Sequence, residues 1–219
     1  MMEIKNRPFF CSWSGGKDSC FALYHALRAG GQPRYLFTML SEEGEHSRAH
    51  ALPLTLLRKQ AAALGIPLVT AAASWEEYEG VYTAQLKEFQ REGVEVGVFG
   101  DIDLEEHRQW VERVCAGVGL EACLPLWKRR RRELVEEFID LGFRAVIVVV
   151  KEERMDARFL GRVLDRPLLT ELEREGVDAA GENGEYHTVI TGGPLFAQPL
   201  RLEVKGRVSR DGYAFLEVE

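Results

Sequence analysis

Residues 14–19 read Ser-Gly-Gly-Lys-Asp-Ser and stand between an apolar run at 9–13 and a helical apolar pattern at 18–29. This order predicts a strand, a glycine turn and the first turn of a helix. Glycine lets the backbone approach a bound group closely, and the N–H groups of a first helical turn attract phosphate. Ser14 and Ser19 add hydroxyl donors and Lys17 adds a cation, so this segment, the phosphate loop, is predicted to bind an anion.

Apolar runs and helical patterns alternate through the first half of the chain. They predict strands at 9–13, 35–40, 66–71 and 94–99, and helices at 18–29, 53–64, 76–92 and 104–118. Such alternation is typical of an α/β fold with a doubly wound parallel sheet. Ligands of these sheets bind beyond the carboxyl ends of the strands. The phosphate loop and the segment Gly100-Asp101-Ile102 should therefore lie together.

The second half of the chain has a different character. Its patterns predict a helix at 133–141, a strand at 145–150, and strand-like runs at 186–190, 200–208 and 213–218, with a hairpin turn at 209–212. We therefore expect two domains, a doubly wound domain over residues 1–124 and a smaller α+β domain over residues 125–219.

Composition excludes several classes of function. The 219 residues include 46% apolar and 29% charged residues, and the longest apolar run, at 145–150, is too short to span a membrane. The N-terminus lacks the apolar segment of a signal peptide, which predicts a cytoplasmic location. The net charge of −7 argues against nucleic acid as the main partner. The basic run at 128–132 is either a solvated helix face or a docking patch for an acidic partner.

A second group of polar residues lies in Gly181-Glu182-Asn183-Gly184-Glu185-Tyr186-His187-Thr188. Its two carboxylates, imidazole and hydroxyl could bind a cationic substrate, ligate Mg²⁺ or move a proton from an attacking amine. An equally simple interpretation is a glycine turn that enters a strand and turns its charged residues to solvent.

The phosphate loop is neither a Walker motif nor a dinucleotide fingerprint. Asp18 follows Gly16-Lys17, Cys11 occupies the position of the leading Walker glycine, and no Gly-x-Gly-x-x-Gly follows the strand. The loop instead resembles the PP-loop signature of the ATP pyrophosphatases, which cleave ATP between the α and β phosphates. The whole chain resembles the diphthine–ammonia ligase branch of these proteins in the phosphate loop, 100–102, Arg108-x-Trp110-Val111-Glu112-x-x-Cys115, 125–127, 159–162, 181–188 and 193–196.

The resemblance implies a Rossmann-like (HUP) ATP-binding domain, with a C-terminal domain on the substrate side. It also implies an ATP-dependent ligase that uses Mg²⁺, adenylates a carboxylate, releases pyrophosphate and forms an amide with ammonia. The carboxylate would be diphthine on an elongation factor. A different small carboxylate, or an ATP- or AMP-binding module without turnover, remains an alternative, and a homo-oligomer stays open. Relatives that transfer sulfur to tRNA usually have paired cysteines, which Cys11, Cys20, Cys115 and Cys123 do not form.

The resemblance also assigns candidate site residues. The phosphates would bind Ser14, Gly15, Gly16, Lys17 and Ser19. Asp18 is a Mg²⁺ ligand or a helix cap, and Asp101, after Gly100, is a Mg²⁺ or nucleotide ligand or a plain loop residue. The acyl and ammonia side would use Glu182, Glu185 and His187, with Lys17 and Asp18 as the other catalytic candidates.

Other polar and aromatic residues receive structural interpretations. For Ser47, Arg48 and His50 a solvated helix start is favoured over a place near the nucleotide. Residues 105–108 are expected to form an exposed first helical turn. Trp110, Trp127 and Phe196 are expected to pack between the domains.

Overall fold

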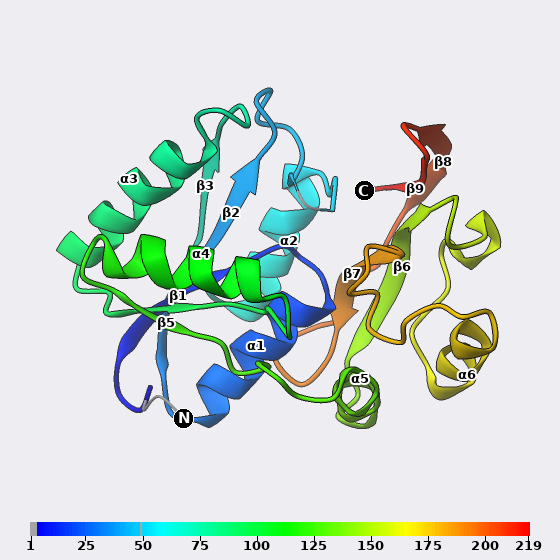
Figure 1. Cartoon of the computed structure of the whole chain (residues 1–219), viewed down its shortest axis with the longest axis horizontal. Helices are drawn as coiled ribbons and strands as arrows, with labels where there is room; N and C mark the ends of the chain where they lie inside the picture. Colours follow the sequence, from blue (N-terminus) through cyan, green and yellow to red (C-terminus); the bar gives the residue numbers. More distant parts are fainter. Residues whose placement is uncertain (1–3, 49) are drawn as a thin grey trace.

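Two sheets organise the chain, one parallel and one antiparallel (Figure 1). The computed structural model describes residues 4–48 and 50–219. The strands of the first sheet alternate along the chain with the helices that cover it. These elements are β1 (Pro8–Ser12), α1 (Lys17–Arg28), β2 (Gln32–Leu40), α2 (Leu54–Leu64), β3 (Leu68–Ala72), α3 (Tyr78–Arg91), β4 (Val96–Val98), α4 (Glu105–Ala116) and β5 (Glu121–Cys123). The strands of the second sheet and the helices around them follow in the chain. These elements are α5 (Arg131–Asp140), β6 (Arg144–Lys151), the 3₁₀ turn η1 (Ala157–Phe159), α6 (Arg166–Arg174), β7 (Tyr186–Gly192), β8 (Val204–Arg210) and β9 (Tyr213–Val218).

The first sheet has the strand order β3-β2-β1-β4-β5, and every pairing in it is parallel. Side chains alternate across it: Phe9 and Cys11 pack in the cluster that contains α1 and α2, and Phe10 packs in the cluster that contains α3 and α4. Helices thus cover both faces (Figure 1). The expected doubly wound α/β fold is confirmed.

The strand order fixes where a ligand can bind. From β1 the chain builds outward through β2 and β3 on one side, then returns to place β4 and β5 on the other side. The carboxyl ends of β1 and β4 therefore flank the point at which the order reverses, where ligands of such sheets bind. The phosphate loop follows β1 and Gly100 follows β4, so the two segments lie together as expected.

The second sheet is antiparallel, with the order β7-β6-β9-β8. Asp211 and Gly212 connect β8 to β9 with φ of 52° and 77°. This is the conformation of a type I′ hairpin turn, so the predicted turn is confirmed. The strand expected at 200–208 instead spans Val204–Arg210.

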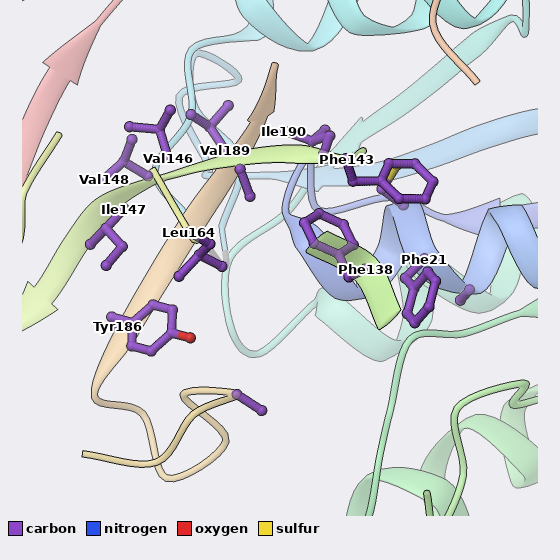
Figure 2. Close-up of a cluster of buried hydrophobic side chains, with 14 of the residues drawn as sticks. Phe21, Phe138, Phe143, Val146, Ile147, Val148, Leu164, Tyr186, Val189 and Ile190 are labelled. Carbon is purple, nitrogen blue, oxygen red and sulfur yellow. The ribbon is translucent and has the colours of Figure 1, made fainter. Parts of the chain in front are cut away.

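The hydrophobic core is continuous between the two sheets. Phe21 of α1 lies against Phe138 of α5 at 5.7 Å and against Phe143 at 6.0 Å, measured between ring centroids (Figure 2). Val146 and Ile190, from β6 and β7, belong to the same buried cluster. The two sheets are therefore held to each other by buried apolar surface as well as by polar contacts.

Three elements, β5, η1 and α6, were not predicted, and one packing expectation is wrong. β5 has only three residues, and α6 was missed although Asp165 caps it by accepting a hydrogen bond from the Leu168 N–H at 2.7 Å. Trp110 does not pack between the sheets. Its ring lies 5.0 Å from that of Tyr82, and its indole N–H donates to Glu79 at 2.9 Å, so it belongs to the α3–α4 face of the first sheet.

Candidate active site

Hydrogen bonds among its own residues hold the phosphate loop. Ser14 Oγ lies 3.1 Å from Ser19 Oγ and accepts from the Gly16 N–H at 3.3 Å. Both oxygens of Asp18 accept from Lys17 Nζ, at 2.8 and 2.7 Å. The α1 N-cap position is Gly16 and carries no side-chain cap, so of the two interpretations of Asp18 the helix cap is wrong.

Strand β7 lies against this loop and joins the second sheet to it. The Lys17 N–H donates to Thr188 Oγ1 at 3.1 Å, and the Ile190 N–H donates to the Gly15 carbonyl at 2.8 Å. Gln60 of α2 completes the contact, since its Nε2 donates to the carbonyls of both Gly15 and Ile190 at 2.9 Å. The loop conformation therefore depends on three elements that are far apart in the sequence.

Two glycines of the loop are required by protein neighbours. Gly15 has a φ of 80°, a left-handed conformation that favours glycine. A Cβ on Gly16 would lie 2.2 Å from His50 Cε1 and 3.0 Å from the Thr188 carbonyl oxygen. Gly100 likewise has no room for a side chain, because its Cβ would lie 2.7 Å from the backbone carbon of Asp18. The absence of a side chain at Gly16 is therefore explained by the close approach of His50 and β7, and the absence of one at Gly100 by the close approach of the phosphate loop.

Two cavities open on either side of the loop. The first, of about 200 Å³, is lined by side chains of β2, the start of α3 and the neighbouring loops, among them Trp13, Phe37, Met39, Arg48 and Tyr78. The second, of about 400 Å³, is lined from one side by Lys17 and from the other by Glu182, Tyr186, His187 and Thr188. Asp18, Gly100 and Asp101 line both cavities. The structure thus brings the predicted loop and most of the predicted 181–188 segment to one site.

Arg48 and Tyr82 line the first cavity, and their Nε and Oη atoms are the two buried side-chain polar atoms for which no hydrogen-bond partner is found among the described residues. A guanidinium nitrogen of Arg48 also donates to the Ala73 carbonyl, and the Arg48 guanidinium stacks 4.3 Å from the ring centroid of the exposed Trp75. Ser47 is buried nearby. The favoured interpretation of Ser47 and Arg48, a solvated helix start, is wrong.

Carboxylates dominate the second cavity. Burial and the neighbouring Asp18 carboxylate raise the pKa of Glu182 to about 7, against the opposing effect of Lys17. Asp101 accepts a hydrogen bond from His107 Nδ1 at 3.2 Å, and this contact raises the pKa of the exposed His107. His107 lies in the exposed first turn of α4, as expected, yet it also lines the second cavity.

The imidazoles of His50 and His187 lie next to each other, and both line the second cavity. The ring centroids of His50 and His187 lie 4.7 Å apart. Burial, followed by the nearby Lys17 cation, lowers the pKa of His187 to about 4. Burial and His187 lower the pKa of His50 well below its ordinary value. Both rings are therefore neutral at pH 7. His50 was expected at a solvated helix start, and no local sequence signal shows that β7 brings Thr188 against it.

Glu185 lies beside the cavity but does not line it. Its buried carboxylate accepts from the Asn183 backbone N–H at 3.0 Å, from Asn183 Nδ2 at 3.0 Å and from the Asp178 N–H at 3.3 Å. Burial raises the pKa of Glu185, but these hydrogen bonds outweigh it and hold the pKa below its ordinary value. The carboxylate thus fixes the shape of the loop that carries Glu182.

The basic run at 128–132 is largely paired within the chain. Arg131 donates to both oxygens of Asp103 at 2.8 and 2.7 Å and to Asp178 at 2.9 Å, and so links the loop before α4 to the loop before β7. Arg129 pairs with Glu137, and Arg132 with Glu136 and Glu173. Because these basic side chains are paired with carboxylates of the same chain, the contacts argue against a docking patch for an acidic partner. Trp127 stacks with Lys128 and Arg108, and Phe196 packs on the main core.

Other features limit the chemistry. Burial raises the pKa of the Cys11, Cys20, Cys115 and Cys123 thiols, which disfavours the reactive thiolate that a sulfur relay needs. Within residues 4–48 and 50–219, no group of three or more His, Cys, Asp or Glu side chains could hold a metal ion. None of the helices in the same part of the chain has both the length and the apolar composition needed to cross a bilayer.

The fold and the phosphate loop at its switch point define a nucleotide-binding α/β protein. Family models named diphthamide synthase N-terminal domain and diphthamide synthase C-terminal domain match residues 9–122 and 130–217. The chain therefore belongs to the diphthamide synthase family, and the resemblance inferred from the sequence is confirmed.

Curated relatives agree with the family models. Proteins named diphthine–ammonia ligase from Homo sapiens and Bos taurus are 29% and 28% identical over 94% of this chain, which covers 86% of each relative. One from Schizosaccharomyces pombe is 25% identical over 88% of the chain, and the match spans 35% of that longer protein.

Proposed function

We propose that this protein is an ATP-dependent ligase that adenylates a substrate carboxylate and converts it to an amide with ammonia, as its relatives' name indicates for diphthine. One observation carries the proposal: Lys17 of the phosphate loop and Glu182 and His187 of the 181–188 segment line the same cavity. This arrangement supports a site for ATP phosphates and a site for an acceptor that would adjoin at Asp18, Gly100 and Asp101, which line both cavities.

The first cavity suits the adenosine portion of ATP. Its aromatic and apolar walls offer stacking surface, and Arg48 Nε and Tyr82 Oη offer buried polar atoms that still need partners. The phosphates would then lie over Ser14, Gly15, Gly16, Lys17 and Ser19 at the start of α1, where the helix dipole and N–H groups favour anions. In this arrangement Lys17 turns from Asp18 to the phosphates.

Asp18 and Asp101 fit the needs of a magnesium ion. Mg²⁺ in nucleotide sites usually keeps several waters and takes one or two carboxylates together with phosphate oxygens. The ion supplies positive charge that neutralises the phosphate oxygens as charge develops on them. Lys17 adds a second cation where the pyrophosphate leaves, and removing one such donor typically costs about 2.7–4 kcal/mol of transition-state stabilisation.

The 181–188 segment would serve the acceptor side. A carboxylate oxygen of the substrate attacks the α-phosphate and pyrophosphate departs, which gives an acyl-adenylate. Ammonia then attacks the acyl carbon, a C–N bond forms, the C–O bond to AMP breaks, and the surplus proton of the new ammonium leaves to a base. We assign that base to Glu182 and propose that neutral His187, which lines the same cavity, acts as a hydrogen-bonding group. Glu185 is a positioning residue that holds the Glu182 loop.

Each of the two sheets would serve one substrate. We propose that residues 1–124 bind ATP and that residues 125–219 supply the acceptor side. Acidic side chains in the second cavity also suit diphthine, whose quaternary ammonium is a cation, presented on an elongation factor.

Isotope exchange tests this proposal. Labelled pyrophosphate should enter ATP only when the carboxylate substrate and Mg²⁺ are present, and ammonium should not be needed. Lys17→Ala should abolish the exchange, whereas Glu182→Gln should retain it and lose amide formation. ATP binding without exchange, with a diphthine-bearing elongation factor and with other carboxylates, would instead identify a nucleotide-binding module without turnover.

A further inference from the structure

A third cavity, of about 240 Å³, lies behind the proposed acceptor site. It is formed where the segment before α2 meets the face of β6, β8 and β9, and its lining includes Ala51, Val149, Val208 and Glu217. In Figure 1 the end of β9 lies beside the segment that leads into α2. The cavity is thus built between the two sheets, separate from the residues assigned to ATP.

His50 connects this cavity to the proposed acceptor site. It is the residue that lines both the second and the third cavity. Its Nδ1 lies 2.9 Å from the Thr188 carbonyl oxygen. Because a carbonyl oxygen only accepts, Nδ1 carries the proton and Nε2 keeps its lone pair in the neutral ring. His50 therefore lies between the two cavities with an acceptor, Nε2, for which no hydrogen-bond partner is found in the described part of the chain.

We propose that the third cavity is the access route by which ammonia reaches the acyl-adenylate in the second cavity, past His50. This inference rests on the proposed ligase function. Ammonia is small enough for this space and carries N–H donors that suit the free Nε2 acceptor. A carboxylate carried by a macromolecule would cover the opening of the second cavity. A separate route through the third cavity would then still allow ammonia to reach the acyl-adenylate. The route changes no bond: ammonia arrives as the nucleophile and loses its proton after attack.

The opening of the third cavity offers a position at which it can be closed after folding. Val208 lines the cavity and is 39% exposed. The next residue, Ser209, is exposed on the opposite face of β8 and does not line the cavity. Three native cysteines are buried and Cys123 is half-buried, so a Cys123→Ser background leaves an introduced thiol as the accessible one.

The experiment compares Val208→Cys and Ser209→Cys after each is labelled with a benzyl or a methyl methanethiosulfonate. The benzyl label on Val208→Cys should raise the KM for ammonium by about tenfold or more, whereas the methyl label should have little effect. Carboxylate-dependent exchange of pyrophosphate into ATP should be unchanged, because that half-reaction needs no ammonia. Reduction with dithiothreitol should restore the original KM, which excludes misfolding as the cause.

Two results would overturn the proposal. The first is a KM for ammonium within about twofold of the unlabelled value when the benzyl label on Val208→Cys is complete, which would place the route at the opening of the second cavity. The second is an equal rise with the label on Ser209→Cys. A wild-type protein without carboxylate-dependent exchange would instead refute the ligase function itself.

Discussion

Thr188 of β7 accepts a hydrogen bond at 3.1 Å from the backbone N–H of Lys17, although the two residues are 171 positions apart in the chain. The contact joins the antiparallel sheet directly to the phosphate loop. The same strand reaches Gly15 through the Ile190 N–H. The loop that would hold ATP is therefore shaped by the part of the chain that would hold the acceptor.

Replacing Thr188 with valine should loosen the phosphate loop. The variant keeps the side-chain shape but removes the acceptor of the buried Lys17 N–H, which should cost about 1–3 kcal/mol in the free energy of unfolding. ATP affinity should fall as well. Thr191→Val is the matched control, because Thr191 is buried on the same strand and donates to the Arg144 carbonyl, away from the loop. Urea denaturation and ATP titration by calorimetry measure both effects. Equal losses of ATP affinity in the two variants would contradict this role of Thr188.

A methyl group on Gly16 should clash with His50. Gly16 has an ordinary negative φ of −99°, so the cost of Gly16→Ala is steric rather than conformational. We expect a loss of about 1–3 kcal/mol in the free energy of unfolding, typical of overpacking. His50→Ala should recover most of this loss in the double variant, because it removes the atom 2.2 Å from the new Cβ. Additive losses in the double-mutant cycle would refute the packing explanation for Gly16.

Acid should destabilise the fold through His187. Its pKa is about 4 in the fold against an ordinary value of 6.5, so between these values the unfolded chain binds the proton and the folded chain does not. The stabilisation is complete above pH 6.5 and is lost as the pH falls toward 4, by about 3 kcal/mol in total. His187→Gln should reduce this pH dependence, with the remainder from His50, whose pKa is also lowered, whereas His46→Gln, at an exposed position, should not reduce it. Urea unfolding between pH 7 and pH 4 measures this pH dependence. If the free energy of unfolding fell equally with pH in wild type and His187→Gln, His187 would not be the cause.

Arg131 should contribute more to stability than its neighbour Arg130. Arg131 is partly buried and bridges Asp103 and Asp178, whereas the side chain of Arg130 is 83% exposed and pairs with Glu133 on the same helix. Arg131→Met should lower the free energy of unfolding by about 1–3 kcal/mol, since it leaves two partly buried carboxylates without their hydrogen-bonding partner. Arg130→Met should change it by less than about 1 kcal/mol. Thermal unfolding of both variants measures these changes. Similar losses of unfolding free energy in the two variants would contradict the bridging role of Arg131.

The sequence predicted what depends on local patterns. Alternating strands and helices indicated the parallel sheet, and the position of the phosphate loop after the first strand placed it at the switch point beside Gly100. The I′ turn at Asp211-Gly212 was equally local. α6 also has a local signal, because Asp165 is a helix cap and Pro167 stands in the first helical turn.

What the sequence did not predict depends on packing between distant segments. His50 is part of the site because β7 brings Thr188 against it, and nothing in residues 47–50 indicates that contact. Glu185 has the residue type of a catalytic group, yet its carboxylate is used by the backbone of its own loop. Spacing alone cannot tell a carboxylate that faces a cavity from one that closes a turn.

Oxygen transfer from the substrate tests the adenylation chemistry most directly. A carboxylate substrate labelled with ¹⁸O should be incubated with the protein, ATP, Mg²⁺ and ammonium, and the nucleotide products analysed by mass spectrometry. Attack of the carboxylate on the α-phosphate predicts one ¹⁸O atom in the AMP formed with each amide, and none in pyrophosphate. Label in inorganic phosphate, with ADP as the nucleotide product, would contradict the account.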